Sequence, residues 1–345
     1  MGKLAKVGIF KGQKAPVRNI LKESGITWFD GVSRVALKKF GLDSIAQALA
    51  TGTTLTVPQI KLLIDRASLP ALMMLVETVR KEDIKNLPRP IISIPAITWL
   101  NDLGFAGALK NASTLFESIG PNKEFQVYIE DLDIFDLNKL ESFLAALKEI
   151  FPKSKFMTPS LGEIVKQLTP VAAKSAKGFE EQLKDFLSLI KKVGFDRILG
   201  SNDRLGLEII GGAGFPIIVR TLIDRYENSS LLARELYNLN KCAADHNVIG
   251  WIPGYESMMT GLRPNASTDF RLLRTLAIGS VVLRNVPFYR ATSAYFTIEG
   301  VKLSFMFGAN DFGFGAFNTE AKHALNLQSI DELSRAISDA EIFHD

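Results

Sequence analysis

Cysteine is almost absent from this chain of 345 residues, in which Cys242 stands alone. One thiol cannot form an internal disulfide, and it cannot supply the several thiolates that a cysteine-bound metal centre requires. The residues around Cys242 have a helical pattern. That pattern favours a small buried side chain, and the alternative interpretation is a reactive thiol.

Histidine is also scarce. The three histidines, His246, His323 and His344, lie far apart, and none has a partner at the spacing of metal ligands. The chain also lacks a Gly-x-Ser-x-Gly motif and a convincing Ser/His/Asp order. We therefore expect neither a zinc site nor a serine-hydrolase centre.

Long apolar runs and one-sided charge are missing as well. The longest uncharged apolar stretch, near 209–219, contains Gly and Pro and is too short to span a bilayer. The first residues lack the continuous apolar segment of a secretory signal. The 41 basic and 37 acidic residues are spread along the chain without a basic stripe. The sequence thus predicts a cytoplasmic protein that has no membrane span and does not bind nucleic acid.

What the chain does have is 47% hydrophobic residues, enough for a large core. From residue 88 onward, segments typical of strands alternate with segments typical of helices. The expected strands are 89–97, 125–130, 155–158, 195–200, 215–220, 247–253, 286–294 and 302–308. The expected intervening helices are 137–151, 179–193, 231–246 and 268–284. This order predicts an α/β fold, a (β/α)8 barrel of the TIM type, with no helix between the last two strands.

Helices are expected before and after the barrel in the sequence. Residues 1–87 form a helical lead-in packed on the barrel, in which Thr56 and Pro58 mark one helix start. Residues 88–320 form the barrel itself. Residues 321–345 carry a C-terminal helix, because Ser329 and Glu332 have the spacing of a capping box.

Three short motifs follow one another near the C-terminus: LRTLA at 273–277, NVP at 285–287 and FGAND at 307–311. With Leu283 and Gly313, their order and spacing resemble the C-terminal barrel segment of the radical-SAM enzymes of futalosine-dependent menaquinone biosynthesis, and of the related deazaflavin synthases. The resemblance covers about two thirds of the chain when weaker upstream similarity is counted. It implies the same barrel.

The same resemblance also shows what this chain lacks. In the related enzymes the first strand is followed by C-x3-C-x2-C, whose thiolates hold an iron–sulfur cluster that binds S-adenosylmethionine. Here Leu100, Gly104 and Gly107 stand at those positions, and residues 97–109 contain no Cys or His. We expect neither the cluster nor S-adenosylmethionine as a cofactor. Gly279 and Ser280 also depart from the family, which usually has Ala-Arg there.

Candidate functional residues are those expected just past the strands, where barrel active sites lie. Asp311 could hold a ribose or act as a base, and Asn310 lies beside it; the alternative is a plain turn. Trp251 and Tyr255 could stack on a base, or simply cover the rim. Glu256 lies near Tyr255 and could line a pocket or act in catalysis. After the second strand, Asp131, Asp133 and Asp136 could hold a hard cation or act in catalysis, and the alternative is an exposed loop.

Three hypotheses about function follow. The leading one is a cluster-less, non-radical paralogue linked to menaquinone biosynthesis, which binds a nucleoside-like molecule or an active radical-SAM paralogue. The alternative is a repurposed barrel enzyme that performs lyase or hydrolase chemistry with Asp311, Glu256 or Asp131. The third is a purely structural subunit.

Overall fold

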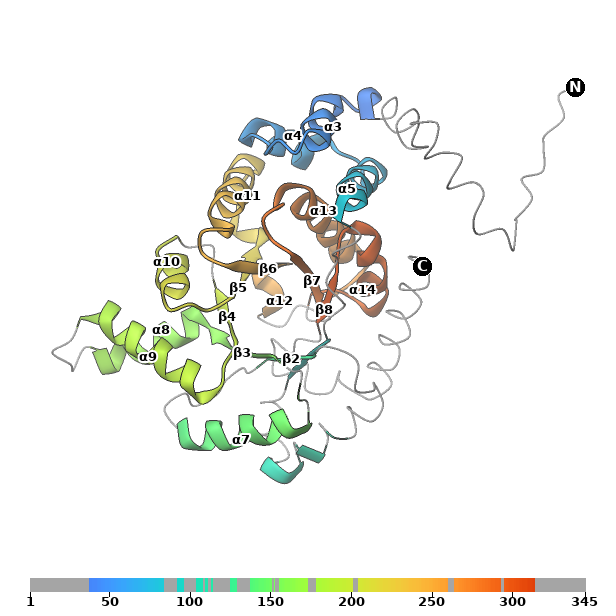
Figure 1. Cartoon of the computed structure of the whole chain (residues 1–345). Helices are drawn as coiled ribbons and strands as arrows, with labels where there is room; N and C mark the ends of the chain where they lie inside the picture. The colour runs from blue at the N-terminus through green and yellow to red at the C-terminus, as the bar shows by residue number, and fades with distance from the viewer. Residues whose placement is uncertain are drawn as a thin grey trace, which may run out of the picture.

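The sheet is a closed barrel of eight parallel strands that are hydrogen-bonded in chain order (Figure 1). The computed structural model describes residues 37–83, 92–95, 104–107, 109–110, 113, 125–128, 137–150, 152, 155–172, 178–200, 204–259, 264–292 and 295–313. The strands are β1 (Ile92–Pro95), β2 (Phe125–Tyr128), β3 (Lys155–Ser160), β4 (Arg197–Gly200), β5 (Ile217–Leu222), β6 (Val248–Gly254), β7 (Phe288–Thr292) and β8 (Asp311–Gly313). The barrel closes where Ile92 of β1 pairs with Phe312 of β8.

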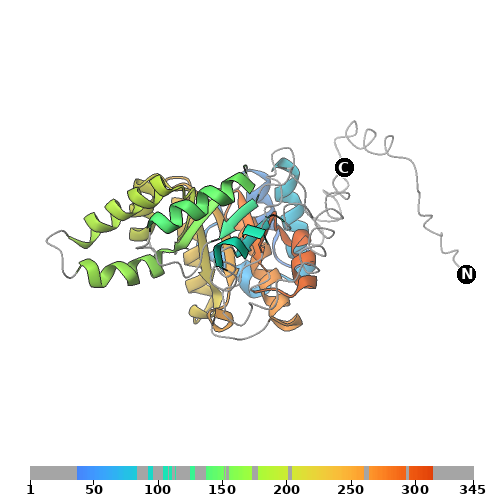
Figure 2. The ribbon, with the colours of Figure 1, turned by 90° about the horizontal axis from the view of Figure 1, so that it is seen from below.

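Helices surround the sheet, as Figure 1 shows. Between the strands lie α7 (Leu137–Ile150), α8 (Leu161–Ala172), α9 (Phe179–Val193), α10 (Arg204–Gly212), η2 (Ile223–Arg225), α11 (Ser229–Ala243), α12 (Glu256–Met259), α13 (Ala266–Val282), α14 (Ile298–Ser304) and η3 (Phe305–Phe307). Two of them, α8 and α9, run side by side and project from the barrel (Figure 2). Among the described residues, no helix is long and apolar enough to cross a membrane.

The predicted α/β class is confirmed, and seven strands lie at or within a few residues of their predicted positions. A (β/α)8 barrel requires a helix after every strand. The chain after β8 lies outside the described residues, as does much of the connection between β1 and β2. The C-terminal helix predicted from Ser329 lies outside them too.

The prediction for 302–308 was wrong, because this segment is helical. Thr297 begins α14, and its hydroxyl accepts a hydrogen bond from the Gly300 amide at 3.0 Å. The buried residues Val301, Ser304 and Phe307 recur every three positions, which is a helical period. Hence a helix does connect the last two strands, and the eighth strand begins only at Asp311.

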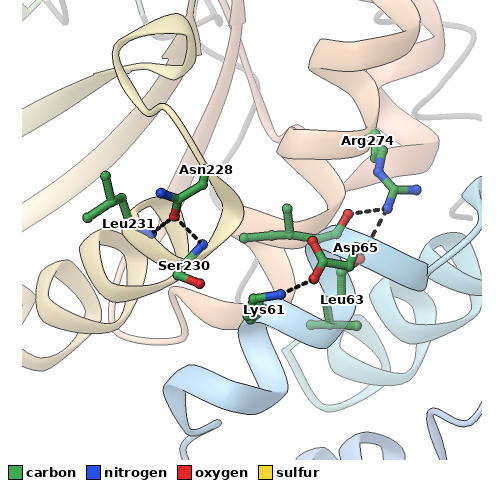
Figure 3. Close-up of polar contacts among 8 residues, drawn as sticks. Lys61, Leu63, Asp65, Asn228, Ser230, Leu231 and Arg274 are labelled. Atoms are coloured by element: carbon green, nitrogen blue, oxygen red, sulfur yellow. Dashed lines mark hydrogen bonds and ion pairs between the residues drawn. The ribbon is translucent and has the colours of Figure 1, made fainter.

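The lead-in is described from residue 37 and includes α3 (Asp43–Ala50), α4 (Val57–Arg66) and α5 (Leu69–Asp83). Of these helices, α4 lies against α11 and α13, α5 lies against α13, and α3 packs on α5 (Figure 1). Arg274 of α13 donates hydrogen bonds to the carbonyls of Ile64 (2.5 Å) and Ala67 at the end of α4. It also donates to the carbonyl of Leu63 at 3.2 Å (Figure 3). A cation is favourable there, because the last carbonyls of a helix lack partners and carry partial negative charge.

Candidate functional site

The strands of the barrel present different chemistry to the interior and to the helices. The Arg197 guanidinium of β4 lies 5.9 Å from the centre of the Phe288 ring of β7. Since β5 and β6 separate these strands around the barrel, this contact crosses the interior. Arg197 and Phe288 therefore point inward, and alternation along β7 also directs Arg290 inward.

A buried ion pair occupies the interior between β7 and β8. Arg290 and Asp311 are in register on the two strands, and they are 3% and 1% exposed. The Arg290 Nε and Nη2 atoms lie 2.8 Å and 2.5 Å from the same oxygen, Asp311 Oδ2. The Asp311 carboxylate is therefore bound by a cation from its own protein.

Asp311 was expected just past the last strand, at the carboxyl-terminal mouth of the barrel. It is instead the first residue of β8 and faces the middle of β7. The difference arises because the segment predicted as the last strand is α14 and η3. Asp311 is thus an interior residue at the amino-terminal end of its strand.

The hydrogen bonds of Asn310 join it to the backbone at the start of β7. Its Oδ1 accepts from the Tyr289 amide at 2.7 Å, and its Nδ2 donates to the Pro287 carbonyl at 2.8 Å. Its own amide donates to the Tyr289 carbonyl at 3.1 Å. The side chain therefore joins the start of β7 to the segment that leads into β8, and Asn310 is 5% exposed.

Trp251 lies on the opposite face of the sheet from the interior. A Cβ at Gly279 of α13 would be 2.2 Å from the Trp251 ring, so the indole fills the space above this glycine. Its Nε1 donates to Thr221 Oγ1 at 2.7 Å, and the side chain is fully buried. The indole packs between β6 and α13 and not at the rim, where it was expected as a stacking surface.

The predicted residue Glu256 lies on the carboxyl-terminal rim, at the start of α12. Arg225 binds its carboxylate in bidentate fashion, at 2.6 Å and 3.1 Å, and this hydrogen bonding lowers the pKa of Glu256. Asp224 accepts from the amides of Glu256 and Ser257 at 2.8 Å and 3.1 Å. Glu256 is exposed and does not meet Asp311, which lies inside the barrel.

Two tyrosines lie near the ends of β6 and β7. Tyr255 follows β6 and is partly buried, and this burial raises the pKa of its phenol, while Arg271 opposes the rise. Tyr295 follows β7 and is fully buried. A Cβ at Gly254 would lie 2.6 Å from the Tyr295 ring, so the ring lies directly on the end of β6. This side of the mouth is covered by an aromatic side chain.

The predicted cluster positions are only partly described. Leu100 and Asp131 lie outside the described residues, whereas Gly104 and Gly107 belong to a short helical segment. Gly104 has a φ of +69°, in the left-handed region. Cys242 lies on α11, where its Sγ donates to the Leu239 carbonyl at 3.6 Å. Within the described part of the chain, no three His, Cys, Asp or Glu side chains gather as a metal site.

The interior arginines were missed in the sequence. Arg197, Arg220 and Arg290 each stand within a strand, in segments that otherwise consist mostly of apolar residues. The interiors of barrels of this type are usually packed with branched apolar side chains. A charged residue inside an otherwise apolar strand is the sequence signal that could have identified them.

Comparison with solved structures identifies the fold. Methylornithine synthase superimposes with a TM-score of 0.61 at 12% identity, over 86% of this chain and 96% of that one. The FeFe-hydrogenase maturase from Carboxydothermus hydrogenoformans gives 0.59 at 12% identity, over 94% and 82%. A second maturase structure gives 0.52 at 9% identity, over 86% and 70%. No protein-family model and no curated protein sequence matches the chain.

These structural neighbours are radical-SAM enzymes. The chain has their fold. At a sequence identity of 12%, this similarity shows a shared fold but not a shared reaction or ligand. The part of the expected resemblance that concerns the barrel fold is therefore supported.

Proposed function

We propose that this protein is a barrel of the radical-SAM type that works without the three-cysteine cluster, as a non-radical paralogue that binds a nucleoside-like molecule or an active paralogue. The observation that carries the proposal is the place of the single cysteine. Cys242 lies on α11, between β5 and β6 in the chain, and not after β1. Three thiolates are needed to hold a radical-SAM cluster, and this chain has one.

The backbone at Gly104 supports the same proposal. Its positive φ is a conformation that an L side chain rarely adopts. A cysteine at this position would therefore be strained. The local chain is built for glycine, which is what we expect if the cluster-binding loop has been replaced as a whole.

The proposed link to futalosine-dependent menaquinone biosynthesis rests on the C-terminal motifs. Two of their residues have structural roles here, because Arg274 binds the end of α4 and Asn310 joins β7 to β8. Such roles explain why the motifs would accompany the barrel whatever reaction it performs. For the whole chain we propose a complete (β/α)8 barrel.

The alternative function is polar chemistry by strand-end carboxylates. It would require two carboxylates in one pocket, as acid–base catalysis does. Asp311 is bound by Arg290 in the interior, and Glu256 is bound by Arg225 on the exposed rim. Asp311 and Glu256, the two described candidates, do not converge in one pocket, which favours binding over lyase or hydrolase catalysis by this pair.

The first experiment is anaerobic purification followed by reconstitution with iron and sulfide, with iron, sulfide and electron paramagnetic resonance as readouts. We expect substoichiometric iron that is unchanged in Cys242→Ser. A stoichiometric iron–sulfur cluster would overturn the proposal. Native mass spectrometry of the protein from its own cells tests the binding role: a retained nucleoside-like mass or a cysteine-bearing partner supports it, and a bare monomer contradicts it.

A further inference from the structure

Three large apolar side chains are exposed on neighbouring elements at one side of the barrel. Phe270 of α13 is 55% exposed, Leu303 of α14 is 48% exposed and Met306 of η3 is 51% exposed. The three elements contact one another, and α5 of the lead-in contacts both α13 and η3 (Figure 1). Large apolar side chains that gather on a protein surface mark a place where another surface binds.

The contacts of neighbouring residues show where Leu303 and Phe270 lie. A Cβ at Gly300 would be 2.5 Å from the Asp269 carboxylate, so Gly300 faces α13. Leu303 is three residues further along α14 and lies on the same side of this helix. Phe270 follows Asp269 and is one turn before Arg274, which binds the end of α4. Phe270 therefore lies between α14 and the lead-in.

The lead-in continues this surface on α5. A Cβ at Gly308, which follows η3, would lie 3.7 Å from Val76 Cγ1, so Val76 faces η3. Met73 is one turn before Val76 on the same side of α5, and it is partly exposed. We call this surface of α5, α13, α14 and η3 the apolar patch, and its residues are Met73, Phe270, Leu303 and Met306.

The chain itself contains a segment whose side chains fit such a surface. Residues 17–36 lie outside the described part of the chain, and their sequence includes Ile20, Leu21, Ile26, Trp28 and Phe29. Contact with water is unfavourable for apolar side chains of this size. The segment leads directly into the described lead-in, which begins at residue 37 with a side chain that is only 2% exposed.

The patch is within reach of this segment. The lead-in helix α3 packs on α5, and α5 borders the patch. Neighbouring helices lie about 8–10 Å apart, so the patch is about 20 Å from α3. An extended chain covers about 3.3 Å per residue, so the part of the chain from Phe29 to Leu37 can span about 26 Å.

The distribution of charge agrees with this contact. Residues 1–36 contain seven basic and two acidic residues, whereas the other 309 residues contain 34 basic and 35 acidic ones. Glu77 is four residues after Met73, and Glu299 is four residues before Leu303, so both exposed carboxylates border the patch. Lys302 pairs with Glu299 at 2.9 Å. The border is thus slightly acidic, which favours the basic end of the chain over an acidic partner.

We propose that residues 17–36 bind the apolar patch of the same chain, with Trp28 and Phe29 as the anchoring side chains. Large aromatic side chains contribute most to contacts of this kind. The bound segment joins α5 to α14 and closes the patch to other proteins. The proposal rests on the described patch and on the sequence of the segment, and it does not depend on the proposed function.

The test is hydrogen–deuterium exchange of the whole chain, together with the fluorescence of Trp28 measured as the difference from Trp28→Phe. We expect residues 17–36 to exchange at least about tenfold more slowly than an unstructured chain. Combining Leu303→Asp with Met306→Asp should remove this protection, because both side chains lie in the patch. The same double variant should shift the emission of Trp28 to longer wavelength.

The matched control is Leu205→Asp, because Leu205 is 59% exposed on α10, away from the patch. It should leave the exchange of residues 17–36 unchanged. The reciprocal variant combines Trp28→Ala with Phe29→Ala and should speed exchange in α14 and η3. This second variant keeps the test valid if the charged patch variant does not fold, as judged by circular dichroism.

Other occupants of the patch give other results. Protection of residues 17–36 that depends on protein concentration, with a doubled mass in light scattering, assigns the patch to a second copy and overturns the contact within one chain. Exchange of this segment at the unstructured rate in the wild type also overturns it. Protection that survives the double patch substitution shows that the segment binds elsewhere, which overturns the proposal as well.

Discussion

The two faces of the barrel sheet differ in chemistry even on neighbouring strands. On the outer face of β6, Trp251 is fully buried against Gly279 of α13 in an apolar layer. On the inner face of β7, Arg290 is just as inaccessible but pairs with Asp311. The outer layer is stabilised by close packing, whereas the inner one requires each charge to be compensated. The outer layer is thus sensitive to changes in side-chain volume, and the inner layer is sensitive to changes in charge.

The largest effect is expected inside the barrel. Asp311→Asn would leave the buried Arg290 without its carboxylate, so we expect the free energy of unfolding to fall by about 3–5 kcal/mol. Urea denaturation followed by circular dichroism measures this. Glu180→Gln, which breaks an exposed pair with Lys184, is the surface control and should cost less than about 0.5 kcal/mol.

A double variant sharpens that result. Replacing Arg290 by Met and Asp311 by Leu together removes both charges, so it should recover most of the stability lost in Asp311→Asn. If the single variant costs no more than the surface control, the interior pair is not the compensated charge that we describe.

The outer layer should respond to volume and not to charge. In Gly279→Ala the new methyl would meet the Trp251 ring, and overpacking of this kind costs about 1–3 kcal/mol. Gly212→Ala at the end of α10 is the matched control, because its Cβ would have no neighbour within 4 Å. Denaturation midpoints compare the two. A neutral Gly279→Ala would show that the indole can move, which contradicts close packing in this layer.

Loss of the contact between the lead-in and the barrel should lower the free energy of unfolding less than the changes in the two layers do. Arg274 is partly buried, and this burial lowers the pKa of its guanidinium, although Asp65 nearby opposes the change. Arg274→Met removes its bonds to three α4 carbonyls and should cost about 1–2 kcal/mol. Hydrogen exchange should be faster in α4 and unchanged in β5 and β6. The control Arg234→Met, at an exposed position of α11, should change neither the free energy of unfolding nor the hydrogen exchange of α4. Faster exchange throughout the barrel in Arg274→Met would argue against a local role for Arg274.

The smallest effect concerns pH at the rim. Burial raises the pKa of Tyr255, so folding favours its neutral phenol, and the associated stability is lost as the pH rises past the usual tyrosine pKa of about 10. Tyr255→Phe cannot ionise. Its melting temperature should therefore fall less than that of the wild type between about pH 9 and pH 11. If the melting temperatures of the two proteins fall equally with pH, Tyr255 is not the group responsible for the loss of stability.

Much of the barrel could be predicted because its strands and helices carry local signals. The period of α9 and the apolar strands β4 and β5 are visible in sequence. The segment 302–308 misled, because Val301, Leu303, Phe305 and Phe307 alternate as in a strand. Its helix begins where Asp269 of α13 binds the Thr297 amide at 2.9 Å, a contact across 28 residues of chain.

The candidate site was harder to predict, for a related reason. A residue type reveals its chemistry but not the face of the sheet on which it lies. Trp251 and Tyr255 are four residues apart, yet the first packs under α13 and the second lies by the rim. Asn310 and Asp311 are adjacent, yet they have different roles. The Asn310 side chain hydrogen-bonds to the backbone of Tyr289, whereas the Asp311 carboxylate pairs with Arg290.

The sequence by itself determined the α/β class, most strand positions and the lack of cysteines for a cluster, because these follow from local periodicity and from composition. Only the tertiary structure decided that Arg197, Arg220 and Arg290 share one interior, that Trp251 belongs to the outer layer, and that Asp311 begins the last strand. These facts depend on which strands meet across the barrel, and residues far apart in the chain decide that together.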